Sequence, residues 1–349
     1  MEECRGGPSC HSRASVTWQI GNAMQDDSTA PSTALKLPER NHRASSRASS
    51  HGGVLDVYEY GVSFVDQMSA MRGYASSGGW VGLFTVGFGL YISFFVMGFS
   101  WVTVLELVLL LIVLALIQSD WVGYRAELVL FDCRARKVHI FKSIGLPWWQ
   151  WCWNIFARPR CEVQTYNWDC VSAEVVSYTI FTGQVPRREA SLVLTISDRP
   201  GSPVEIQRVG VGPSFGFGNQ SGPVERWEYI RRMMEGVGPV WTPGESRYQD
   251  FAVSLGEALT IAQPLIGPGS HQYWKKGPAT WLLGTISLIA LPLTAYIGLN
   301  RYVSYRLQRK PRWPAEVLHS VGAGPFTDAT LRERLSLEKP GAGGTKRRR

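Results

Sequence analysis

The strongest constraint on this chain is the stretch from Trp80 to Gln118, in which Glu106 is the only acidic or basic residue. The stretch is about twice the roughly 20 residues that one helix needs to cross a hydrocarbon layer about 30 Å thick. Gly98-Phe99-Ser100 near its middle favours a tight turn, so residues 80–118 predict a transmembrane hairpin of two helices. A later apolar run, Ala279–Leu299, predicts a third transmembrane helix. We therefore expect a multi-pass membrane protein.

The charge of the chain is basic and lies late in the sequence. The formal net charge is +8, with clusters at Arg301–Arg312 and Lys346–Arg349. Beside a membrane span, such clusters indicate a cytoplasmic flank or contact with anionic lipid. We expect the lipid bilayer as a partner and no nucleic acid.

The positive-inside rule leaves the topology open. Residues 125–137 after the second predicted span are basic, and so are residues 301–312 after the third. Three full crossings would place these two flanks on opposite sides, against the rule. Either the third segment does not cross fully, or one flank lies outside. No secretory leader precedes the first apolar run, which favours a cytoplasmic strand-rich module.

The rest of the chain divides by composition. The N-terminal residues are rich in Ser, Ala, Pro and Arg and show no apolar period, which predicts disorder. Met24 or Met68 could be the true start. The expected parts are a disordered tail (1–53), a pre-membrane segment (54–79), the hairpin (80–118), a strand-rich module with a helix (125–240), a helical connector (243–276), the third span (279–299) and a basic tail (300–349).

The module is predicted from β-rich segments followed by one amphipathic helix. Residues 126–132 and 137–142 flank a short polar loop and predict a β-hairpin. Residues 210–222 are rich in glycine and predict a surface loop. The helix is expected to start at Gly222 and Pro223, with Val224, Trp227, Ile230 or Arg231, and Met234 on one face. The expected fold class is an α+β membrane protein whose module is of the pleckstrin-homology type.

Three catalytic or ligand-binding patterns are absent from the sequence. It contains no H-E-x-x-H, no phosphate-binding G-x-x-x-x-G-K and no C-x-x-C. We therefore expect no enzyme activity, no metal and no cofactor. The four cysteines after the hairpin could pair in an oxidising compartment or stay reduced in the cytosol.

Two further features have alternative interpretations. Four tryptophans near residue 150 favour a membrane interface, and a core cluster is equally consistent. They are Trp148, Trp149, Trp151 and Trp153. Glu106 could belong to an ion pathway, or it could lie close enough to the turn to reach headgroups; we favour the second.

Four motifs carry a resemblance. They are F-D-C-R-A-R-K-V at 131–138, N-W-D at 167–169, W-E-Y-I-R-R-M-M-E at 227–235 and P-R-W-P-A-E at 311–316. Together they resemble a family of uncharacterised bacterial inner-membrane proteins, often encoded beside type VI secretion genes and their lipase effectors. Cys133 and His139 replace the Arg and Tyr of that pattern. The matching positions are Phe131, Arg134, Lys137, Trp168, Trp227, Arg231, Arg232, Trp313 and Pro314.

The resemblance implies residence in a bacterial inner membrane and a secretion-linked context, with no catalytic residue. The leading hypothesis is a non-enzymatic membrane protein whose module binds a toxin (immunity) or a secretion component (accessory role). One alternative is a lipid- or signal-sensing scaffold at the membrane surface. Another is a small transporter or channel subunit that uses Glu106.

Overall fold

The structure is a computed structural model of the chain. It describes residues 33–66, 73–123, 128–145, 160–181, 186–216, 220–242, 244–248, 254–262, 291–307, 311–322, 324–331 and a few single positions. Trp148, Trp149, Trp151 and Trp153 lie outside the described residues, as does most of the predicted 243–276 connector.

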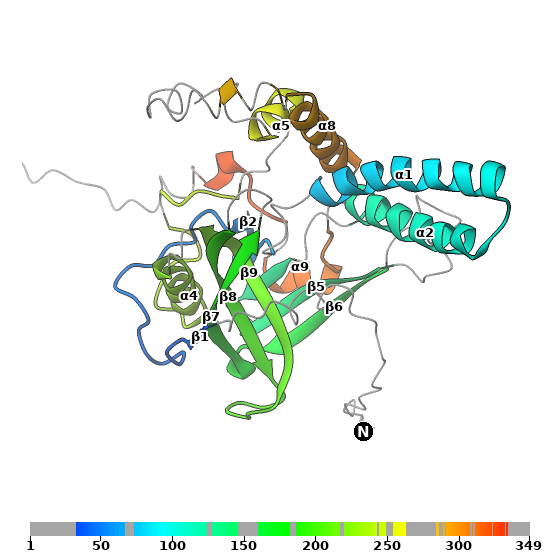
Figure 1. Ribbon diagram of the computed structural model, residues 1–349. Helices are drawn as coiled ribbons and strands as arrows, with labels where there is room; N and C mark the ends of the chain where they lie inside the picture. Colours follow the sequence, from blue (N-terminus) through cyan, green and yellow to red (C-terminus); the bar gives the residue numbers. More distant parts are fainter. Residues whose placement is uncertain are drawn as a thin grey trace, which may run out of the picture.

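Two antiparallel sheets form the body of the molecule (Figure 1). The four-stranded sheet has the order β1-β7-β8-β9, with bounds Thr33–Lys36, Val171–Phe181, Pro186–Ser197 and Glu205–Gly216. The five-stranded sheet has the order β2-β3-β4-β5-β6, with bounds Val54–Val57, Gly61–Phe64, Val129–Asp132, Lys137–Gly145 and Arg160–Asn167. The β-hairpin predicted for residues 126–142 is confirmed as β4 and β5. The predicted α+β class is confirmed as well. The likeness to a pleckstrin-homology module stays a prediction.

Strands β1, β2 and β3 precede the apolar hairpin in sequence. They nevertheless belong to the two sheets whose other strands follow the hairpin. In β1, Leu35 pairs with Val175 of β7, and in β3, Val62 pairs with Phe131 of β4. The prediction of disorder is wrong for residues 33–53, because Leu37 and Ser50 are buried there. A chain that began at Met68 would lack all three strands.

Residues 210–216 correct a second prediction. They form the second half of β9, in which Gly210 pairs with Val193 and Phe215 with Ala190 of β8. The glycines concealed the strand because glycine lowers strand propensity. Gly212, at φ 73, marks the irregular register in the middle of the pairing.

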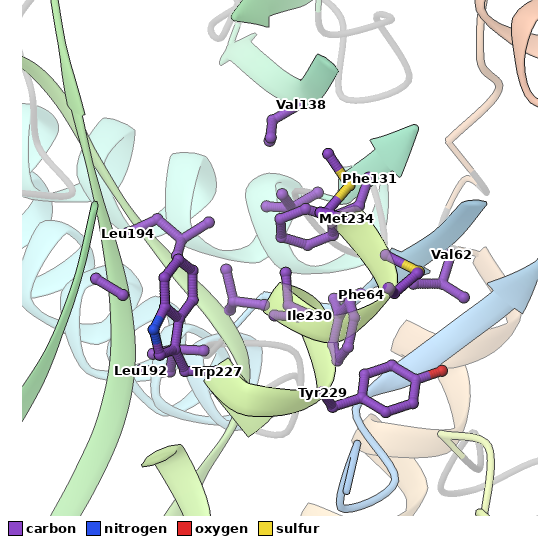
Figure 2. Packing of buried hydrophobic residues seen from close by; sticks show 14 of the residues in the cluster. Val62, Phe64, Phe131, Val138, Leu192, Leu194, Trp227, Tyr229, Ile230 and Met234 are labelled. Carbon is purple, nitrogen blue, oxygen red and sulfur yellow. The ribbon is translucent and has the colours of Figure 1, made fainter. Parts of the chain in front are cut away.

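Helix α4 (Ser221–Met234) lies in the core between the two sheets (Figure 2). Trp227, Ile230 and Met234 are buried, as their spacing predicted. Figure 2 shows these side chains between Phe131 of the five-stranded sheet and Leu192 of the four-stranded sheet. A buried aromatic or aliphatic side chain of this size contributes about 1.5–3 kcal/mol, so α4 holds the two sheets together.

Helices α1 (Tyr74–Ile92) and α2 (Trp101–Trp121) project from the body as an antiparallel pair (Figure 1). A π-helical turn, Ser93–Met97, extends α1, and Gly98 at φ 75 ends it. Residues 74–96 and α2 are long and apolar enough to cross a membrane. The predicted hairpin is thus present, starting six residues earlier and ending three residues later than expected.

The remaining described helices are α5 (Leu255–Ala262), α8 (Leu291–Leu307) and α9 (Ala315–Ser320). The described part of the predicted third span, 291–299, lies in α8, which continues for eight residues beyond it and buries Arg301. Among the described helices, α1 and α2 alone have the length and composition of a span. Helix α9 covers the outer face of the five-stranded sheet, where Trp313 packs against Phe141.

Candidate functional site

The hairpin α1–α2 presents apolar side chains to the outside along most of its length. Such a continuous apolar surface is far larger than monomeric soluble proteins leave uncovered. The side chains with large exposed fractions include Phe84, Phe88, Phe94, Phe95, Val96, Val104, Leu105, Val108, Leu109 and Ile112. The hairpin is therefore suited to an apolar surrounding.

Aromatic side chains mark the two ends of the hairpin. At the end near the sheets, the rings of Trp80 and Trp121 lie 5.4 Å apart. At the tip, Trp101 is 76% exposed. Twenty residues of helix separate Trp101 from Trp121, which corresponds to about 30 Å. This length equals the thickness of a hydrocarbon core, and tryptophan is enriched at both of its boundaries.

Glu106 lies between the two helices. Gly89 of α1 faces it so closely that a Cβ there would come within 2.6 Å of Oε1 of Glu106. Gly79 and Gly82 face Ile117 and Val113 in the same way, so small residues let the helices approach each other. Oε2 of Glu106 is buried and has no hydrogen-bond partner among the described residues. The carboxyl group thus packs against α1, about two helical turns from the tip.

A buried aspartate closes the base of the hairpin. Asp120, near the end of α2, accepts hydrogen bonds from the backbone amides of Gly73 (3.0 Å) and Ser76 (2.8 Å) and from the Ser76 hydroxyl (2.6 Å). The Ser304 hydroxyl of α8 donates to Oδ1 of the same carboxylate (3.2 Å). The first amides of a helix have no partner within it, so Asp120 caps α1 from a neighbouring helix.

Helix α8 is attached at this base. Asn300 donates to the Ser77 hydroxyl (3.0 Å) and accepts from the indole of Trp121 (2.9 Å). Beyond α8, the backbone amide of Arg309 donates to the carbonyl of Gly123 (3.2 Å). The chain after α2 and the chain after α8 therefore lie side by side. Because of this contact, the two basic flanks need not fall on opposite sides of a membrane.

We predict that Asp120→Ala loosens this base. The substitution leaves two backbone amides and the Ser76 hydroxyl without the carboxylate that accepts from them, which should lower the free energy of unfolding by about 2–3 kcal/mol. The measurement is denaturant unfolding of the full chain in detergent micelles. Ser119→Ala is the matched control, since Ser119 is exposed and bonds only to the carbonyl of Leu116. A loss no larger than that of the control would show that Asp120 does not hold the base.

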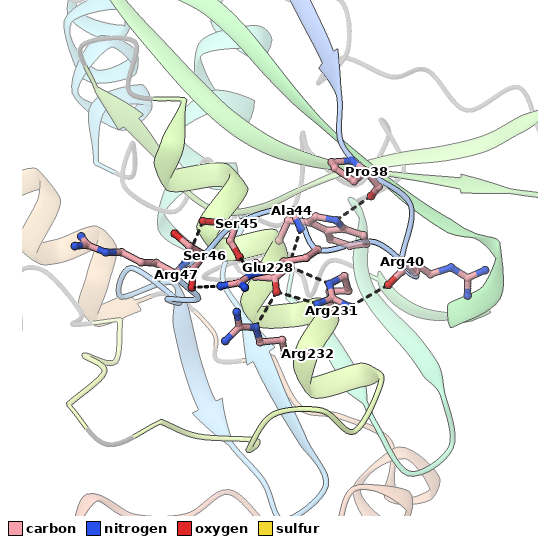
Figure 3. Close-up of polar contacts among 11 residues, drawn as sticks. Pro38, Arg40, Ala44, Ser45, Ser46, Arg47, Glu228, Arg231 and Arg232 are labelled. Atoms are coloured by element: carbon pink, nitrogen blue, oxygen red, sulfur yellow. Dashed lines mark hydrogen bonds and ion pairs between the residues drawn. The ribbon is translucent and has the colours of Figure 1, made fainter.

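A second polar cluster holds the N-terminal segment on α4 (Figure 3). We call residues 37–53 the strap. The buried carboxylate of Glu228 accepts from the backbone amide of Ala44 (3.0 Å), from both ends of the Arg231 guanidinium (2.8 and 3.0 Å) and from Arg232 (2.7 Å). Arg231 also donates to the carbonyl of Arg40 (3.1 Å). One carboxylate thus joins α4 to the strap.

Burial alone would raise the pKa of Glu228, but hydrogen bonds from Arg231, Ala44 and Arg232 lower it to about 2. A carboxyl whose folded-state pKa is depressed stabilises the fold above its unfolded pKa of about 4.3.

We therefore predict that stability falls as the pH is lowered from about 5 to about 2, where Glu228 is protonated. Urea midpoints recorded at stepwise pH measure the effect. In Glu228→Gln the same titration should be visibly shallower, and an unchanged slope would contradict the assignment.

Arg226 was not singled out in the sequence, although it is fully buried. Its guanidinium donates to the carbonyls of Val211 (2.9 Å) and Pro213 (2.8 Å) in β9 and lies 4.4 Å from the ring centroid of Phe215. Burial lowers its pKa to about 9. A weaker bond to the carbonyl of Ser50 (3.3 Å) adds the strap to this contact. Arg226 lies one residue before the motif at 227–235, and no local sequence pattern marks it as buried.

Three of the positions that carried the resemblance meet in the core. The ring of Trp168 lies 6.3 Å from the ring of Phe131 and 5.4 Å from that of Trp227, and the Trp168 indole donates to Glu235 at 2.7 Å. Arg134 lies over the ring of Tyr60, with 5.1 Å from its guanidinium carbon to the ring centroid. The remaining positions lie elsewhere: Lys137 at the exposed start of β5, Arg231 and Arg232 on α4, and Trp313 and Pro314 before α9. Their described contacts are those of structural residues.

The described residues contain no group of three or more His, Cys, Asp or Glu that could hold a metal. Cys133 and Cys170 are free thiols.

Comparison with known protein families supports the prediction that this chain belongs to an uncharacterised family. Residues 106–323 match a family of unknown function (DUF6708), and the match runs from α2 to just beyond α9. No curated protein and no solved structure matches the chain. Since the matched residues make up more than half of the sequence, the chain belongs to this family of unknown function.

Proposed function

We propose that this chain is a non-enzymatic integral protein of the bacterial inner membrane, in which the hairpin α1–α2 anchors a two-sheet module that binds a protein partner. The observation that carries the anchoring is the exposed apolar surface of the hairpin, with tryptophans about 30 Å apart at its two ends. Burying that surface in lipid removes its contact with water.

The sidedness follows from the base of the hairpin. Both ends of an inserted hairpin emerge on the side of the sheets, together with the chain after α8. Residues 134–137 and 301–312 would then lie on the same side of the membrane, and by the positive-inside rule we take that side to be the cytoplasm. The module would face the cytoplasm, and α8 would not cross as a third span.

A binding role suits the module better than a transport role suits the hairpin. Transport through the bilayer needs a polar path, and Glu106 is the only charged residue between Trp80 and Gln118. A carboxyl packed against Gly89 fills an interhelical gap. The partner class, a toxin or a secretion component, rests on the sequence resemblance alone.

Where a toxin gene is found beside this gene, co-expression of the two tests the immunity role. Cells that make the toxin should survive when the full chain is present and die when it is absent. A chain with residues 74–121 replaced by a short polar linker tests whether protection needs the anchor. Killing that the full chain does not change, with the chain found in the membrane, would contradict immunity and leave the accessory role.

A further inference from the structure

The chain that leaves α8 carries a dense set of cations. Arg306, Arg309 and Arg312 follow one another within seven residues, and no acidic residue occurs between Leu291 and Ala315. We call residues 306–312 the basic connector. The sequence of the basic connector itself contains no acidic residue.

Two contacts hold the described part of the basic connector, one at its middle residue and one just beyond its last residue. The backbone amide of Arg309 bonds to Gly123, two residues beyond the end of α2 at Trp121. One residue after Arg312, Trp313 packs against Phe141 on the outer face of the five-stranded sheet. The basic connector therefore runs from the level at which the hairpin leaves its apolar surrounding to the surface of the module.

The side chains at this level suit a phosphate group. Arg306 is exposed, and its guanidinium carbon lies 5.3 Å from the ring centroid of Tyr302. Arg312 is exposed as well. A guanidinium group binds phosphate with two parallel hydrogen bonds, and a tyrosine beneath it suits the boundary between lipid and water.

The exposed surface of α8 is apolar in the first half of the helix and carries a cation at its end, next to the basic connector. Leu291, Leu293 and Leu299 are exposed in its first half without an exposed cation, whereas the exposed Arg306 lies beside Leu307 at its end. An amphiphilic gradient along the helix axis matches the passage from acyl chains to headgroups.

We propose that the basic connector is a binding site for the phosphate headgroups of anionic phospholipids in the leaflet nearest the module. This inference rests on the membrane anchoring proposed above and adds the class of lipid. Each arginine near an anionic surface should strengthen binding about fivefold.

Native mass spectrometry of the full chain, purified in detergent and supplied with phosphatidylglycerol or phosphatidylcholine, tests the proposal. The unmodified chain should retain phosphatidylglycerol in preference, and the preference should weaken with salt. R306Q/R312Q should bind phosphatidylglycerol about fivefold more weakly for each arginine removed, with phosphatidylcholine binding unchanged.

R188Q/R199Q is the matched control, since it removes the same charge from exposed positions of β8 and of the turn after it. Equal retention of the two lipids by the unmodified chain, or an equal loss in the control, would overturn the proposal. Alkaline extraction separates this result from failure of the anchor. If R306Q/R312Q and the unmodified chain both stay in the membrane, the anchoring stands whatever the lipid preference.

Discussion

Replacing Glu228 by alanine is expected to lower the free energy of unfolding by about 3–5 kcal/mol. The side chain is 0% exposed and accepts hydrogen bonds from Arg231, Arg232 and the amide of Ala44. Its removal leaves the Arg231 guanidinium, which is only 11% exposed, without the carboxylate that neutralises it. Urea unfolding of the full chain in detergent, followed by tryptophan fluorescence, measures the loss.

Glu205→Ala is the control for this prediction. Glu205 pairs with Arg208 at 3.1 Å, but both side chains are about half exposed, so the pair should contribute less than about 1 kcal/mol. If the free energy of unfolding of Glu228→Ala were within about 1 kcal/mol of that of the unmodified chain, the strap would not depend on the hydrogen bonds of Glu228.

The second large effect is expected from truncation. A chain that begins at residue 54 lacks β1 and the strap. It therefore loses the pairing with β7 and leaves Glu228, Trp227 and Arg226 without their strap partners. Several kcal/mol is a large part of the roughly 5–15 kcal/mol that stabilises a domain, so this chain should not fold cooperatively.

A chain that begins at residue 33 keeps β1 and every contact described for the strap. It should resist limited proteolysis as the full chain does, whereas the chain from residue 54 should be degraded within the module. Equal resistance of the two truncated chains would mean that the strap is dispensable.

The hairpin α1–α2 could be predicted from sequence because a long apolar run with a single charged residue indicates a membrane-spanning segment. Its start could not. Helix α1 begins at Tyr74, among serines, because Asp120 caps it from 47 residues away. No pattern in the residues around Tyr74 indicates that Asp120 caps this helix. The basic flank after α8 could be read equally well as lying on either side, and the bond from Arg309 to Gly123 is what brings the two flanks together.

The module shows the same limit. Strands β4 and β5 are rich in residues that favour strands and are joined by a short polar loop, so their pairing was predictable. Strand β1 has four residues, and its partner Val175 lies 140 positions later, so a window of the sequence contains no trace of the pair. The resemblance identified Arg231 and Arg232 as matching positions. That both donate to the carboxylate of Glu228 is known only from the structure.

The central claim is that α1–α2 anchors this protein in a membrane. Its most direct test is flotation on a density gradient after alkaline carbonate extraction, which compares the full chain with the chain in which residues 74–121 are replaced by a polar linker. The full chain should float with the vesicles and the replaced chain should stay in the dense fraction. A full chain released by carbonate, or a replaced chain that still floats, would contradict the anchor.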